Sequence, residues 1–95
     1  MNSRVHIFVS GKVQGVFFRV ETVYQAKNEN VTGWVRNRSD GRVEAIFEGN
    51  KKNVEKMVDF CKKGPKGAIV KSTEVTWEEY IGESQDFQIF RTVFF

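Results

Sequence analysis

Residues 11–19 read Gly11-Lys12-Val13-Gln14-Gly15-Val16-Phe17-Phe18-Arg19, and this stretch predicts the junction between a strand and a helix. Gly15 can adopt a positive φ, which lets the neighbouring backbone N–H groups converge on one spot. The helix start that follows carries unpaired N–H groups and partial positive charge. Arg19 adds a permanent charge and a planar set of donors that matches two phosphate oxygens. The stretch therefore predicts a phosphate-binding loop, and the alternative is an ordinary surface loop with a solvated arginine.

The spacing of apolar residues on both sides of this loop predicts a strand before it and a helix after it. Residues 4–10 alternate with the period of a strand. From about Phe18 to Asn28 the period becomes helical, and Asn30 is expected to end the helix in the left-handed conformation. The positions expected on the apolar faces are Val5, Ile7 and Val9 in the strand, and Val20, Val23 and Tyr24 in the helix.

A hairpin and a second helix are predicted next. Residues 31–37 and 42–48 are expected to form strands around a turn that contains Asp40-Gly41, a strong hairpin signal. Asn50 is expected to cap the second helix, which ends before Gly64. The expected buried stripe of this helix is Val54, Met57, Val58 and Cys61.

The order of elements predicts the fold class. Residues 69–77 and 87–91 supply two further strands, so the chain is expected to be an α/β (α+β) sandwich. The specific prediction is a ferredoxin-like β-α-β-β-α-β fold with an additional C-terminal strand and two helices packed on one face of an antiparallel sheet. We expect residues 1–95 to form a single domain.

Composition narrows the class of protein. The chain has 95 residues, a formal net charge of +3 and one cysteine, so it cannot form an internal disulfide. Cys61 is expected to be a packed core thiol. There is no long apolar run and no signal-peptide pattern, from which we expect a cytoplasmic location and no membrane association. We also expect a monomer.

The apolar C-terminus is a separate feature. Residues 88–95 combine high β-propensity with a single charged side chain, Arg91. We expect Thr92 to Phe95 to lengthen the final strand, and the alternative is a segment that mediates self-association.

A second motif places an asparagine near the loop. In residues 31–37, Asn37 shares the alternation of Val31 and Val35, so its side chain is expected on the helix side of the sheet together with Arg19. The alternative is that Asn37 only starts the turn.

The two motifs together resemble the acylphosphatase family. That family has a G-x-V-Q-G-V-x-F-R loop and a G-[WY]-V-x-N strand followed by a D-G-x-V-E return, and both are present at typical spacing in residues 11–19 and 33–44. Further similarity in Glu48-Gly49, Gly64-Pro65 and Phe87-x-Ile89 extends the resemblance over roughly residues 4 to 91.

The resemblance implies hydrolysis of small acyl phosphates to carboxylate and inorganic phosphate, without a metal or another cofactor. It implies that Asn37 orients the attacking water. Phosphate or other anions are expected as product or inhibitor, and no nucleic acid is expected as a partner. The residues whose backbone is implied in phosphate binding are Gln14, Gly15, Val16, Phe17, Phe18 and Arg19, with Arg19 also acting through its side chain.

Two other hypotheses remain. A nucleic-acid-binding module could use the same fold, but Glu44 and Glu48 would repel phosphates from the face that such modules use. An acylphosphatase-like domain that binds anions without turnover is disfavoured because Arg19 and Asn37 are both present. His6 is expected on the sheet face opposite the core and is not assigned as a general base.

One departure from the family pattern bears on the site. Arg38-Ser39 stands where many members have a hydrophobic residue and proline. This difference is expected to loosen the turn that carries Asn37 and to add a positive charge beside the site.

Overall fold

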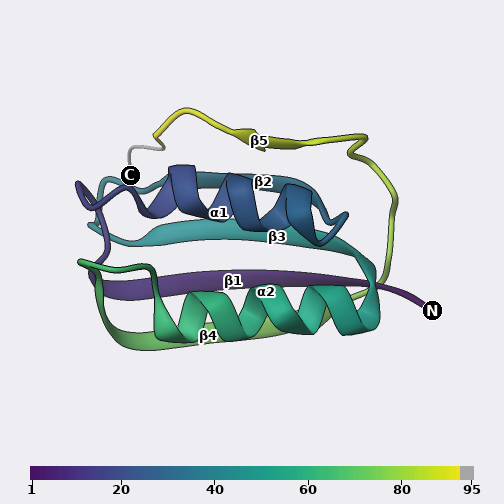
Figure 1. Cartoon of the computed structure of the whole chain (residues 1–95), viewed down its shortest axis with the longest axis horizontal. Helices are drawn as coiled ribbons and strands as arrows, with labels where there is room; N and C mark the ends of the chain where they lie inside the picture. Colours follow the sequence, from purple (N-terminus) through teal and green to yellow (C-terminus); the bar gives the residue numbers. More distant parts are fainter. Residues whose placement is uncertain (93–95) are drawn as a thin grey trace.

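The computed structural model describes residues 1–92 and forms two layers, with two helices on one face of a five-stranded sheet (Figure 1). This arrangement confirms the predicted ferredoxin-like sandwich with its additional strand. Neither helix within these residues is long and apolar enough to cross a membrane. In chain order the elements are β1 (Asn2–Lys12), α1 (Phe18–Asn28), β2 (Thr32–Asn37), β3 (Val43–Asn50), α2 (Lys51–Lys63), β4 (Ile69–Glu78) and β5 (Phe87–Ile89).

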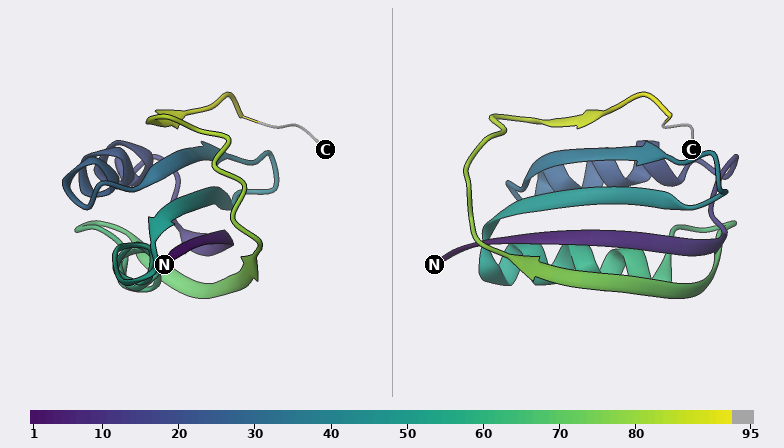
Figure 2. Two further views of the ribbon diagram at one scale, coloured as in Figure 1. Left: turned by 90° about the vertical axis from the view of Figure 1, so that its right-hand side faces the viewer. Right: turned by 180° about the vertical axis from the view of Figure 1, so that it is seen from behind.

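The sheet has the order β4-β1-β3-β2-β5, and β5 corrects one detail of the prediction. β1 pairs antiparallel with β3 and β4, and β2 pairs antiparallel with β3. β5, however, pairs parallel with β2, so the sheet is mixed. The connection over residues 79–86 crosses one end of the sheet from β4 to the opposite edge (Figure 2). Because it arrives at the end where β2 begins, β5 runs in the same direction as β2.

The core lies between the sheet and the helices, as the strand alternation predicts. Val5, Ile7 and Val9 are fully buried, which confirms the expected face of β1. All four positions of the stripe predicted in α2 are buried. Asn50 caps this helix, since its side-chain oxygen accepts a hydrogen bond from the Lys52 N–H at 3.1 Å.

The buried face of α1 differs from the predicted one. Val20 and Tyr24 are 57% and 61% exposed, whereas the residues buried against the sheet are Phe18, Thr22 and Ala26. Burial of Thr22 is tolerated because its hydroxyl donates to the Phe18 carbonyl at 2.7 Å. Of the three predicted positions, Val23 is partly buried against the core, whereas Val20 and Tyr24 are not part of the buried face.

β5 is shorter than the predicted strand, and both aromatic packing and hydrogen bonds to β2 hold residues 86–90 on the sheet. Phe87 is buried and stacks on Phe47 at a centroid distance of 5.5 Å. The Phe90 N–H donates to the Val35 carbonyl at 2.9 Å, and the Phe90 ring stacks on Trp34 at 5.3 Å. The expectations for the C-terminal extension stay predictions, because residues 93–95 lie outside the described part of the chain.

Candidate functional site

The loop between β1 and α1 presents a row of unpaired backbone donors. Gly15 has the positive φ predicted for it, 74°, and Phe17 is also left-handed at φ 61°. Phe17 occupies the N-cap position of α1 and makes no side-chain capping bond. Within residues 1–92, the N–H groups of residues 14–19 donate no hydrogen bond. The loop and the helix N-terminus thus leave these donors available to an anion.

Arg19 lies beside these donors and has no partner of its own in the described part of the chain. Its side chain lines a pocket of about 300 Å³ at the start of α1. Arg4, Arg36 and Arg42, in contrast, each form an ion pair with a carboxylate. The pocket therefore holds a guanidinium whose charge no carboxylate of residues 1–92 neutralises.

Asn37 reaches the same pocket from the other side. It is the last residue of β2 and shares the alternation of Gly33 and Val35, which are buried toward the helices. Its side-chain oxygen is buried and has no hydrogen-bond partner. A buried polar atom without a partner costs about 1 to 3 kcal/mol, so this oxygen is suited to accept a hydrogen bond from a bound water.

The structure brings most of the predicted site residues to one place. Gln14 and Val16, from the predicted phosphate loop, do not line the pocket, and Val16 packs partly against the core. Sequence reasoning missed Val13 and Val20 as lining residues. Val20 could have been found because it lies one helical turn after Phe17. The lining residues are Val13, Gly15, Phe17, Phe18, Arg19, Val20 and Asn37.

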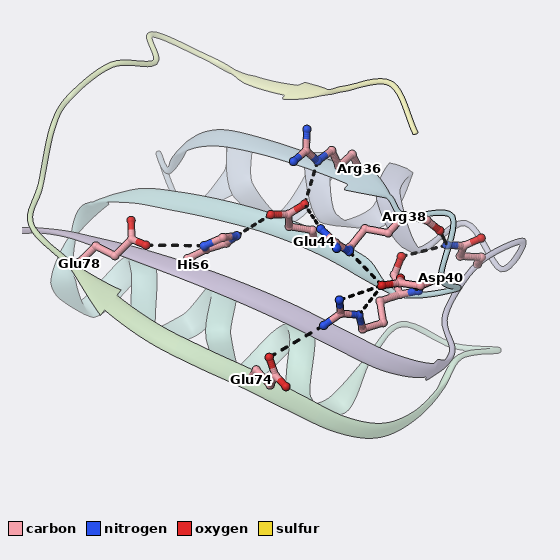
Figure 3. Close-up of polar contacts among 9 residues, drawn as sticks. His6, Arg36, Arg38, Asp40, Glu44, Glu74 and Glu78 are labelled. Carbon is pink, nitrogen blue, oxygen red and sulfur yellow. Dashed lines mark hydrogen bonds and ion pairs between the residues drawn. The ribbon is translucent and has the colours of Figure 1, made fainter. Parts of the chain in front are cut away.

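The open face of the sheet carries an ion-pair cluster centred on Glu44 (Figure 3). One carboxylate oxygen of Glu44 accepts from Arg36 at 2.9 Å and from Arg38 at 3.1 Å. The other lies 2.6 Å from the Nε2 of His6. Burial opposes ionisation of Glu44, but these donors outweigh it and lower its pKa. Glu48 is paired with Arg4 in the same way, so both carboxylates of the open face have an arginine as partner. The expectation that no nucleic acid binds stays a prediction.

This cluster also corrects the expectation for Arg38. The Arg38 guanidinium pairs with Glu44 and Asp40 on the open face, so it does not add its charge to the pocket. In the turn itself the Gly41 N–H donates to the Arg38 carbonyl at 3.1 Å and the Arg38 N–H to the Arg42 carbonyl at 2.9 Å. The expectation of a looser turn stays a prediction.

His6 lies on the open face, as predicted, and not at the pocket (Figure 3). Among residues 1–92 there is no group of three or more His, Cys, Asp or Glu side chains that could hold a metal ion. The expectation of a reaction without a metal stays a prediction.

Comparison with known proteins gives a consistent result. The sequence model of the acylphosphatase family matches residues 5–89. An acylphosphatase from Pyrobaculum islandicum is 55% identical over 93 residues, which cover 97% of this chain and 98% of that protein. One from Pelotomaculum thermopropionicum is 53% identical over 87 residues, covering 92% of this chain and 95% of that protein. The crystal structure of acylphosphatase from Bacillus subtilis superposes with a TM-score of 0.88 at 34% identity, covering 95% of this chain and 99% of that one.

Proposed function

Because the chain belongs to the acylphosphatase family and is thus an enzyme that hydrolyses acyl phosphates, we propose that Arg19 and the amides of residues 14–19 bind the phosphoryl group while Asn37 orients the attacking water. One observation supports this assignment of roles. The guanidinium without a partner, the free amides and the buried Asn37 oxygen without a partner all belong to one pocket or its loop.

Hydrolysis of an acyl phosphate requires positively charged and hydrogen-bonding groups of the kind found in this pocket. The water oxygen forms a bond to phosphorus, the bond from phosphorus to the acyl oxygen breaks, and the carboxylate leaves with the bonding electrons. The protons of the water go to the phosphate product and to solvent. Because a carboxylate is a good leaving group, catalysis requires positioning and stabilisation of charge on the phosphoryl oxygens more than a strong base. Arg19 and the loop amides would supply that positive charge, which is why we propose a reaction without a metal.

The proposal also covers the substrate, the inhibitor, the location and the oligomeric state. A small acyl phosphate would be the substrate, with inorganic phosphate as product and competitive inhibitor at the same amides. The cytoplasmic location and the monomeric state expected from the sequence are kept as proposals. Size-exclusion chromatography of the purified chain, with and without phosphate, tests the monomeric state.

Two substitutions test the roles separately, with acetyl phosphate as substrate and a metal chelator present. Arg19→Ala is expected to abolish both turnover and inhibition by phosphate, since Arg19 would contact the ground state and the transition state alike. Asn37→Ala is expected to keep the inhibition constant of phosphate but to lose on the order of a hundredfold in kcat.

Arg91→Ala is the matched control, because Arg91 is an exposed arginine that does not line the pocket. It should leave both measurements unchanged. Near-normal kcat in a folded Asn37→Ala variant would refute the role of that residue in orienting water. Loss of wild-type turnover in the chelator would refute the metal-free mechanism.

A further inference from the structure

The side chain of Gln14 connects the loop to the hairpin that carries Asn37. Its amide nitrogen donates to the Arg38 carbonyl at 2.8 Å and to the Arg42 carbonyl at 2.9 Å. A primary amide has two N–H donors, so these two bonds use both of them. The acceptors stand at the base of the turn between β2 and β3, where the Arg38 N–H also bonds the Arg42 carbonyl.

This contact joins the two chain segments between which the pocket lies, the β1–α1 loop and the end of β2. Gln14 belongs to the loop with the free amides, and Arg38 directly follows Asn37. The bonds span 24 and 28 residues of sequence. These two side-chain hydrogen bonds join the loop of residues 13–17 to the turn of residues 38–42.

We infer that Gln14 is a positioning residue that fixes Asn37 relative to the phosphate-binding groups. This inference rests on the proposed function, since it assigns Gln14 an effect only through the water that Asn37 orients. A misplacement of about 1 Å between reacting groups can cost on the order of a hundredfold in rate. Two hydrogen bonds that hold the turn against the loop control that distance directly. The Gln14 side chain itself does not line the pocket and needs no contact with substrate.

A purely structural role would look different in kinetic measurements. If Gln14 merely stabilised the fold, its loss would lower the melting temperature and would act independently of Asn37. If it acts through Asn37, its loss should matter little once the Asn37 amide is gone. A double-mutant cycle measures this dependence.

The experiment compares wild type, Gln14→Met, Asn37→Ala and the double variant, each with acetyl phosphate and with inorganic phosphate as inhibitor. Methionine has a similar length but cannot donate. Gln14→Met is expected to lower kcat by about tenfold to a hundredfold while the inhibition constant of phosphate changes by less than about threefold. In the Asn37→Ala background the same substitution is expected to lower kcat by less than about threefold. Gln85→Met is the control, because Gln85 is an exposed glutamine in the connection before β5. It should change neither kcat nor the inhibition constant of phosphate.

Three results would overturn the inference: unchanged kcat in folded Gln14→Met, equal effects of Gln14→Met in both backgrounds, or a phosphate inhibition constant that worsens as much as kcat. If Gln14→Met does not fold, Gln14→Asn enters the same cycle under the same criteria, because its shorter side chain cannot reach both carbonyls. A normal kcat in Asn37→Ala would instead refute the proposed function.

Discussion

At the scale of single residues, two buried oxygens without hydrogen-bond partners differ in their surroundings. The side-chain oxygens Asn37 Oδ1 and Glu48 Oε1 are the buried side-chain atoms in residues 1–92 without a hydrogen-bond partner. The other oxygen of Glu48 accepts bonds from the Ile81 and Gly82 N–H groups and pairs with Arg4, so that carboxylate is already well compensated. Asn37 has no such compensation and faces the pocket. The unpartnered oxygen of Asn37 therefore supports the proposed site, whereas that of Glu48 belongs to a carboxylate with other partners.

At Gly33 the backbones of β2 and β3 approach each other closely. Its φ is 135°, and an added Cβ would lie 2.0 Å from the Ile46 carbonyl oxygen. Backbone atoms cannot rotate away, so Gly33→Ala is expected to lower the free energy of unfolding by about 3 kcal/mol or more. Gly41→Ala is the control: φ is 92° but no atom lies within 4 Å, so a loss of about 1 to 2 kcal/mol is expected. Urea denaturation measures both, and equal losses would contradict the steric argument.

At the scale of elements, an ion-pair network around the buried pair of Arg4 and Glu48 anchors the connection between β4 and β5. Arg4 on β1 pairs with Glu48 at 3.2 Å, with Glu78 at 2.9 Å and with Glu83 at 3.0 Å. Glu48 on β3 also accepts from the backbone of residues 81 and 82. The network thus fixes the segment that carries β5 across the sheet.

This network predicts a dependence of stability on pH. Burial opposes ionisation of Glu48, but the N–H groups of Ile81 and Gly82 and the charge of Arg4 outweigh it, so the pKa of Glu48 is lowered in the folded state. A lowered carboxyl pKa contributes stability that is present above the usual glutamate value of about 4.3 and is lost as the pH falls through the folded-state pKa. Glu48→Gln is expected to lower the free energy of unfolding at pH 7 by about 2 kcal/mol or more and to flatten its decline below pH ~5.

Glu83→Gln provides the matched comparison, because Glu83 also contacts Arg4 but its side chain is 46% exposed. An exposed pair contributes little, so a loss below about 1 kcal/mol is expected. Denaturation curves measured from pH 3 to 7 for both variants and wild type check this difference. A Glu48→Gln curve parallel to that of wild type would contradict the role given to Glu48.

Sequence reasoning succeeded where a signal is local. The stripe and cap of α2, the turn at Asp40-Gly41 and the positive φ of Gly15 depend on neighbouring residues, and the structure has all of them. It failed for Val20 and Tyr24 on α1, which are exposed, and it missed Thr22, which satisfies its hydroxyl within the helix and can be buried. It missed the side-chain hydrogen bonds of Gln14, whose acceptors are far away in the sequence. The same holds for the direction of β5, which depends on the path of residues 79–86 across the sheet.

At the scale of the whole molecule, the pocket and the ion-pair cluster around Glu44 lie on opposite faces of the sheet. The helix face carries the pocket, at the end of the sheet where the β1–α1 loop meets the β2–β3 turn (Figure 1). The open face carries Glu44 and its arginines, which compensate one another (Figure 3). The basic groups of the open face are thereby held away from the pocket, and Arg19 stays free on the other side.

Truncation after Arg91 tests what residues 92–95 contribute to activity and aggregation. A chain truncated after Arg91 keeps the packing of Phe87 on Phe47 and the hydrogen bond from the Phe90 N–H to Val35. It also keeps Arg19 and Asn37, so hydrolysis is expected to stay within about twofold of wild type, because every lining residue of the pocket within residues 1–92 is kept. The removed segment is apolar and uncharged, so aggregation under mildly destabilising conditions is expected to slow. Truncation after Asp86 is the contrasting variant and is expected to fail to fold, because it removes the buried Phe87 ring and the whole of β5. Light scattering at matched stability compares the aggregation rates: equal rates would remove the tail from the explanation, and loss of folding after Arg91 would show that the removed residues belong to the core.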